Sequence, residues 1–225
     1  MAAVFDRRPS RCPVLYCGSR SRLRSPTRAR AASVEQAFLT GLGLAAPAGL
    51  NAYLPLLIVA IADRFVGGIT LDRPYDILSS NLGIGLLVVL LTIELVVDKI
   101  PAIDHLNDLV QSAIRPSAGA YLMMASTVDT GLDPVVALLI GLASAGGVHA
   151  VKASARPAVT VTTGGMGNPL VSMVEDGIAA TVAILAIAAP IVAMVFLAVA
   201  LLLAIWAARW VGRRARRRTA TSSPP

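Results

Sequence analysis

Charged residues, aromatic residues and cysteines are all scarce in this chain. Only 15% of its 225 residues are charged, whereas soluble domains are nearer ~25%, and only 4% are aromatic. The hydrophobic share is 56%, the mean hydropathy is +0.71, and the apolar residues fall in long runs. This pattern excludes an ordinary soluble domain and predicts an all-α integral membrane protein, a polytopic helix bundle.

The sequence also lacks the signatures of metal centres and of common enzyme sites. Its two cysteines, Cys12 and Cys17, are spaced C-x4-C with no histidine nearby, and structural zinc needs four ligands. We therefore expect free thiols, no metal site and no cofactor. No HExxH, P-loop or GxSxG motif is present, so no catalytic residues are predicted. One enzymatic alternative stays open, because Asp98, Asp104 and Asp108 offer the oxygen ligands that Mg²⁺ takes in phosphoryl transfer.

Basic residues are concentrated at the two ends of the chain. Eight arginines lie within residues 1–34 and six within Arg209–Arg218, whereas Glu35–Ala208 has twelve acidic and six basic residues. We expect residues 1–34 and 212–225 to be disordered cytoplasmic tails that touch anionic lipid headgroups. The tails lack the interleaved aromatics and the folded frame that nucleic-acid binding needs, so no nucleic-acid partner is predicted. Self-association into a homo-oligomer stays open.

Residues 35–211 are predicted to form one transmembrane domain. Apolar segments cover Glu35–Asp63, Asn81–Val97, Asp133–Ala155, Leu170–Ala188 and Pro190–Val211. The segment Ser117–Val128 is apolar too, but its twelve residues rise only ~18 Å, against a hydrocarbon core of ~30 Å. It is long enough to cross only if the polar turn before it belongs to the same helix. With both tails cytoplasmic the number of crossings is even, so we predict six.

The first apolar segment carries several helix-breaking residues close together. Pro47, Gly49, Asn51 and Pro55 fall within nine residues, and proline removes a backbone donor and an i−4 hydrogen bond. Non-helical backbone at membrane depth is tolerated only against protein or a water-filled cavity. We therefore predict an opened helix here, with a merely kinked helix as the alternative.

An internal repeat relates this segment to a later one. Without gaps, LGLAAPAGLNA (Leu42–Ala52) aligns with IGLASAGGVHA (Ile140–Ala150), so that Asn51 falls on His149. We predict a repeat of about residues 36–128 and 133–211, inverted because three crossings separate the copies, with a second helix break at Gly147 and His149. Such inverted repeats with interrupted helices are a transporter architecture. The alternative is a small-residue packing face, which uses the same residue types.

Polar residues inside or beside the apolar segments are candidates for function, since charge at membrane depth is costly. Candidates for binding a proton or cation are Glu94, Asp98, Glu175 and Asp176. Candidates for binding an anion are Arg115, Arg156 and Lys152, with neutralisation of nearby acids as the alternative for the arginines. Asp104, Asp108 and Gln111 precede Arg115 on one predicted helix face and form a polar stripe with it.

Four stretches of the chain resemble a known bacterial family. They are APAGLNAYLPLL, IELVVDKIPAIDHLNDLVQSAIRP, GGVHAVKASARP and TTGGMGNPLVSMVED, and in this order they are similar to the membrane-protein family called domain of unknown function 4126. The likeness covers roughly Glu35 to Ala188. It implies a multi-pass protein of the bacterial inner membrane, and no catalytic residue carries over from it.

The sequence thus favours a transporter-like protein that moves a small or amphiphilic anion, with protons or cations as the coupling ion. The substrate, a small molecule or a lipid, is not identified by the residues. A non-transporting membrane scaffold or accessory subunit is the second hypothesis, and the Mg²⁺-dependent membrane enzyme is the third.

Overall fold

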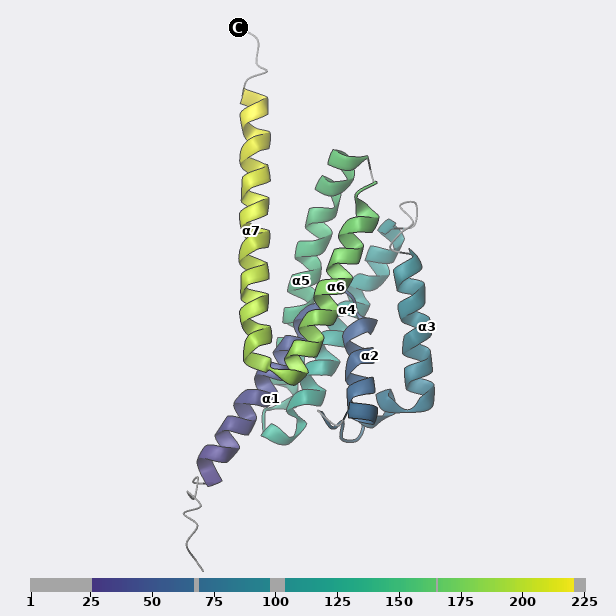
Figure 1. The fold of residues 1–225 in the computed structure, drawn as a ribbon, viewed down its shortest axis with the longest axis vertical. Helices are drawn as coiled ribbons and strands as arrows, with labels where there is room; N and C mark the ends of the chain where they lie inside the picture. Colours follow the sequence, from purple (N-terminus) through teal and green to yellow (C-terminus); the bar gives the residue numbers. More distant parts are fainter. Residues whose placement is uncertain (1–25, 67–68, 98–103, 165, 221–225) are drawn as a thin grey trace, which may run out of the picture.

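The computed structural model describes residues 26–66, 69–97, 104–164 and 166–220, which fold into helices joined by turns (Figure 1). Within these ranges there is no strand, so the all-α prediction is confirmed. Short helical turns occur at Ala62–Val66, Tyr75–Ser79 and Val128–Thr130. The longer helices are α1 (Pro26–Ala48), α2 (Tyr53–Ile61), α3 (Asn81–Val97), α4 (Asp104–Thr127), α5 (Pro134–Thr163), α6 (Asn168–Ala188) and α7 (Pro190–Ala220).

Local sequence explains where several helices begin and end. Helix α5 starts after Asp133, whose side chain accepts hydrogen bonds from the amides of Val135 and Val136, and Pro134 occupies its first turn. Helices α6 and α7 meet at Ala189, directly before Pro190. Helix α4 continues through Pro116, so the short apolar segment Ser117–Val128 does share one helix with the polar turn before it.

The first predicted crossing is a hairpin that returns to the end of the bundle where it began. Figure 1 shows α1 rising to about half the height of the bundle and α2 descending beside it. Gly43 lies against Ala193 at the start of α7, and Asp63, just after α2, binds Ser79 just before α3. The predicted opening at Pro47 to Asn51 is therefore a reversal of direction.

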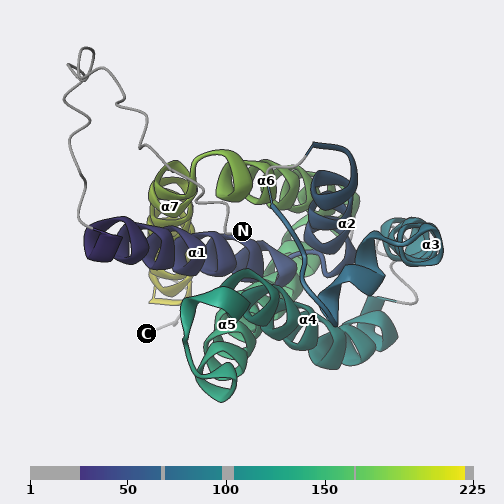
Figure 2. The ribbon, with the colours of Figure 1, turned by 90° about the horizontal axis from the view of Figure 1, so that it is seen from below.

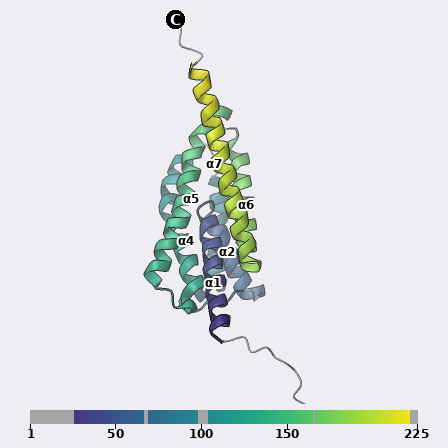
Figure 3. The same cartoon turned by 90° about the vertical axis from the view of Figure 1, so that its left-hand side faces the viewer.

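This hairpin changes the number of passes through the bundle. Helices α3 to α7 alternate in direction along the bundle (Figures 1 and 3), so the start of α1 and the end of α7 lie at opposite ends. The predictions of six crossings and of both tails on one side do not match this arrangement. Helix α1 starts at Pro26 and α7 ends at Ala220, so helix extends into part of each predicted tail; residues 1–25 and 221–225 lie outside the described ranges.

The predicted second helix break is wrong. Helix α5 runs without interruption through Gly147 and His149, and it rises in the same direction as α1 (Figure 1), whereas inverted copies would run in opposite directions. One matching pair of glycines serves close packing: Gly43 packs against Ala186 of α6, and Gly141 packs against the backbone of α4 at Gly119. The second pair differs, because Gly49 lies against Ala145 while a Cβ atom at Gly147 would meet nothing within 4 Å. Close approach through small residues thus accounts for the first pair.

The bundle has a small-residue core and an apolar exterior. Helix α1 lies between α6 and α7 on one side and α4 and α5 on the other (Figure 2), and its residues Leu44, Ala45 and Ala48 are fully buried. Large apolar side chains on α3, α5, α6 and α7 point outward instead. Among the described residues, α5 and α6 are long and apolar enough to cross a membrane, and Asn81–Val97 and Pro190–Leu203 are shorter apolar stretches.

Candidate functional site

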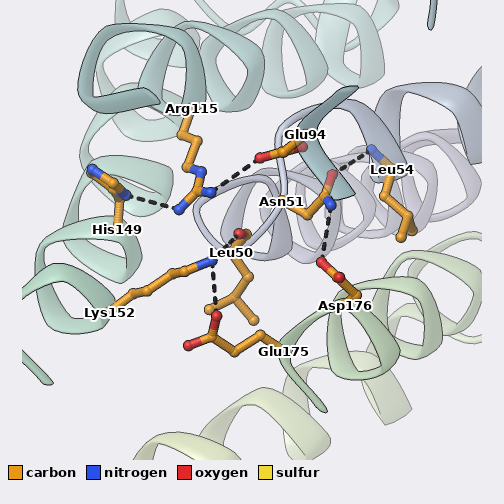
Figure 4. A network of polar contacts seen from close by, with 9 residues as sticks. All are labelled: Leu50, Asn51, Leu54, Glu94, Arg115, His149, Lys152, Glu175 and Asp176. Atoms are coloured by element: carbon orange, nitrogen blue, oxygen red, sulfur yellow. Dashed lines mark hydrogen bonds and ion pairs between the residues drawn. The ribbon is translucent and has the colours of Figure 1, made fainter. Parts of the chain in front are cut away.

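The reversal between α1 and α2 exposes backbone groups that later helices satisfy (Figure 4). The carbonyl of Leu50 accepts a hydrogen bond from Lys152 Nζ of α5 at 2.9 Å. The side chain of Asn51 bridges two elements: its Oδ1 accepts from the Leu54 amide at 3.0 Å, and its Nδ2 donates to Oδ1 of Asp176 in α6 at 2.9 Å. Ends of helices leave such groups unpaired, so these side chains make an interrupted helix tolerable inside the bundle.

A buried arginine joins three helices beside the reversal. Arg115 of α4 is fully buried, and its Nη2 donates to Oε1 of Glu94 in α3 at 3.0 Å. Its Nη1 lies 3.2 Å from Nδ1 of His149 in α5. A guanidinium only donates, so Nδ1 of His149 is the acceptor and the imidazole in this contact is neutral. A proton on Nδ1 would replace the acceptor with a donor and place two cations together.

A second ion pair links α5 and α6. Lys152 Nζ lies 2.8 Å from Oε2 of Glu175, while the same ammonium group binds the Leu50 carbonyl. Lys152 is 4% exposed, and a small hollow of about 20 Å³ adjoins the pair, with room for one water-sized particle. Arg156, one turn further along α5 and half-buried, lines the same hollow.

This core holds charges of both signs. Arg115 and Lys152 face the carboxylates of Glu94 and Glu175, and the carboxylate of Asp176 accepts from Asn51. Arg156 adds a further cation beside the hollow that Lys152 and Glu175 line. Buried charges of this kind are tolerated when they are paired.

The structure brings most of the candidate residues together, but not as one acidic cluster. Glu94, Glu175 and Asp176 each face a different partner, namely Arg115, Lys152 and Asn51 (Figure 4). Both buried cations therefore hold a carboxylate in this state, which is the arrangement of the neutralisation alternative. The described part of the chain leaves three candidates open: Asp98 lies outside it, and only the backbones of Asp104 and Asp108 in α4 are described.

Sequence reasoning missed the links to the reversal. Lys152 was predicted as an anion-binding candidate and His149 as part of a helix break, yet they bind Leu50 and Arg115. A signal was present, since His149, Lys152 and Arg156 are spaced i, i+3 and i+7 and so share one face of α5. The pairing of Asn51 with Asp176 had no such signal, because 125 positions separate them.

These observations define a class of protein: an all-helical bundle with an apolar exterior, a re-entrant hairpin and a charged interior. Comparison with known proteins then places the chain. It belongs to the family described as Domain of unknown function (DUF4126), whose sequence pattern matches residues 38–210. No curated protein and no solved structure matches the chain.

Proposed function

We propose that the chain is an integral membrane protein in which α3 to α7 cross the bilayer and α1–α2 enters it and turns back. The exposed apolar side chains support this proposal. On α3 they include Leu82, Val89 and Val96, and α5, α6 and α7 carry similar residues along their lengths. The charged side chains Glu94 and Arg115 are instead buried. A bilayer is the solvent that suits such a surface.

The proposed activity is movement of a small anion together with a proton. The observation that carries it is the pair of buried salt bridges, Arg115–Glu94 and Lys152–Glu175, placed on either side of an interrupted helix. Ionisable groups within a membrane commonly mark the path of an ion or substrate. Interrupted helices supply backbone groups at the same depth.

The chemistry of the first salt bridge suits such coupling. A proton that binds the Glu94 carboxylate removes its negative charge, so the attraction to Arg115 is lost. The guanidinium, which stays charged at all accessible pH values, then pairs with an incoming anion in the carboxylate's place. One proton and one negative charge enter together, so the net charge of the core is unchanged. His149 keeps the guanidinium in position through Nη1 while Nη2 changes its partner.

The second salt bridge connects this exchange to the helix reversal. Lys152 holds both Glu175 and the Leu50 carbonyl, and Asn51 ties the same turn to Asp176. Protonation of Glu175 or arrival of an anion at Lys152 would alter the support of residues 49–52. The reversal is therefore the element we expect to move when the core changes partners.

The test is proton uptake by proteoliposomes that contain a pH-sensitive dye. The outer solution is set at pH 5.5 and supplied in turn with chloride, hydrogen phosphate or glycolate, and protein-free vesicles give the passive leak. We expect at least one anion to acidify the interior faster with protein than without it. The Glu94→Gln variant mimics the protonated side chain, so it should fold and still bind the anion but lose the coupled proton flux. Glu35→Gln, an exposed residue of α1, is the matched control and should behave as wild type.

Two results would count against this function. Coupled flux that survives in Glu94→Gln removes the coupling role from that residue. Absence of flux with every anion, together with tolerance of Glu94→Gln and Glu175→Gln, supports the scaffold alternative. That alternative draws on one observation: Arg115 and Lys152 each already have a carboxylate partner, which also suits a purely packing role.

A further inference from the structure

Gln111 is a buried polar residue that the exchange described above does not use. It belongs to α4, is only 3% exposed, and its side-chain Oε1 accepts no hydrogen bond from the part of the chain that the structure describes. A buried acceptor left without a donor destabilises the folded protein, because it loses its hydrogen bonds to water and gains none in return. Such a group points to a donor that arrives from outside the chain.

The position of Gln111 relates it to both buried cations. It precedes Arg115 by four residues, so it lies one turn further towards the upper end on the same face of α4. Helices α4 and α5 are antiparallel: Gly119 meets Ala145, and Arg115 meets His149. This register places the turn of Gln111 opposite the turn of α5 that carries Lys152. Gln111 therefore lies at the level of Lys152, one turn above the level of Arg115.

We propose that Gln111 Oε1 accepts a hydrogen bond from a hydroxyl group on the transported anion, which makes Gln111 a specificity-determining residue. The inference rests on the proposed function and narrows its substrate class. An anion held by Arg115 that also satisfies Gln111 carries a hydroxyl group next to its charged group. α-Hydroxycarboxylates and hydrogen phosphate have this chemistry, whereas simple carboxylates and halides do not. Sites built around such a buried polar group reject analogues that leave it unpaired.

Glycolate and acetate separate this proposal from simple anion binding, because they share a carboxylate and differ by one hydroxyl group. Their affinities are measured by calorimetry on the detergent-solubilised full chain at pH 5.5, at equal concentrations of ionised ligand. We expect wild type to bind glycolate about tenfold more tightly than acetate, which corresponds to about 1.4 kcal/mol for one hydrogen bond to a buried acceptor. The Gln111→Leu variant should bind both with the affinity that wild type has for acetate.

Controls keep the result interpretable. Gln36→Leu removes an exposed glutamine of α1 and should keep the preference for glycolate, and Gln111→Met offers a second apolar side chain if leucine disturbs packing. Acetate binding by the variants reports that the core is still folded.

Each outcome has a distinct meaning. Equal affinities of wild type for glycolate and acetate, or a preference for glycolate that survives in Gln111→Leu, overturns the role of Gln111 and leaves the proposed function standing. Tighter binding of acetate also overturns it, since the amide would then present its NH₂ group to the ligand. Failure of wild type to bind any of the anions tested, hydrogen phosphate and chloride included, overturns the proposed function and this inference together.

Discussion

Arg115 is the largest side chain that is fully buried in the described part of the chain. Its guanidinium contacts Glu94 through one terminal nitrogen and His149 through the other, a fork that a lysine ammonium group cannot reproduce. Its two partners lie on two helices and fix its orientation, so a displacement of either partner also shifts the guanidinium relative to the other. The residue therefore links α3, α4 and α5 through one rigid group.

One carboxyl group in a connection between helices has a shifted pKa. Asp72, in the connection between α2 and α3, is hydrogen-bonded to Asp129, and this contact with the nearby negative charge raises the pKa of its carboxyl above the ordinary value. The folded protein thus holds a proton on Asp72 more tightly than the unfolded chain does. The associated stabilisation is present at acid pH and is lost as the pH rises through the raised pKa.

The Asp72→Asn substitution tests this sign. An asparagine donates to Asp129 without needing a proton. Wild type should therefore lose stability as the pH rises above about 4, the ordinary aspartate range, and the variant should not show this loss. The midpoint of thermal unfolding, measured from pH 4 to pH 7 in detergent, should decline relative to the variant as the pH increases. Glu35→Gln serves as control. A constant difference between wild type and Asp72→Asn across this range would contradict the shared proton.

At the scale of single residues, the sequence located the candidates but not their partners. Glu94, Arg115 and Glu175 could be recognised because charge is rare in apolar segments. The i, i+4 rule pairs residues only within one helix, and Glu94 and Arg115 are on different helices. Their pairing depends on how α3 and α4 pack, which no local pattern specifies.

At the scale of elements, α4 and α5 pack with their backbones close together. A Cβ atom at Gly141 would collide with the carbonyl oxygen of Gly119 and with the α-carbon of Ala120. Neither atom can move without shifting helix α4. The absence of a side chain at Gly141 therefore sets the distance between the two helices that carry Arg115 and His149.

Substituting Gly141 with alanine should destabilise the protein by about 1–3 kcal/mol, the usual cost of overpacking. Gly85 of α3 is the matched control, because its added methyl group meets nothing within 4 Å. There the change should stabilise the helix by up to about 1 kcal/mol. Thermal unfolding in detergent should rank Gly85→Ala at or above wild type and Gly141→Ala below it. The opposite ranking would show that α4 and α5 are not packed through Gly141.

The element scale also shows why the first crossing was predicted wrongly. Pro47, Gly49, Asn51 and Pro55 correctly indicate a break, and α1 does end at Ala48. A break alone does not say whether the chain continues or turns back. Here Gly49 lies directly against the backbone of α5 at Ala145, a residue 96 positions later in the chain. This contact forms at the point where the chain turns back from α1 into α2.

At the scale of the whole molecule, basic residues lie at both ends of the bundle. The end of α7 carries the arginines of Arg209–Arg218. The opposite end has Arg64 and Arg73, and α1 starts there within the arginine-rich first 34 residues. The positive-inside rule counts Lys and Arg and gives acidic residues little weight, so it selects neither orientation. Under the proposed function α5 crosses the membrane, and the turns at its two ends should face opposite sides.

Reporter fusions test this crossing and also measure the orientation. Alkaline phosphatase folds only outside the cytoplasm, so it should be active in one of two fusions, after Thr130 or after Gly164, and inactive in the other. Green fluorescent protein after the C-terminus should fluoresce when the Thr130 fusion is the active one, because α7 ends on the side of Gly164. Equal phosphatase activities at Thr130 and Gly164 would rule out a crossing by α5.

The hairpin has a consequence for the order in which the protein is made. The Leu50 carbonyl binds Lys152, which is synthesised 102 positions later, and Asn51 Nδ2 binds Asp176, 125 positions later. At about 5–20 residues per second, a ribosome needs on the order of ten seconds to synthesise these later residues. During that interval the Leu50 carbonyl and Asn51 Nδ2 lack their native partners. The first hydrophobic segment to be synthesised should therefore be the last to reach its final place, held near the membrane surface or by the insertion machinery until α6 has emerged.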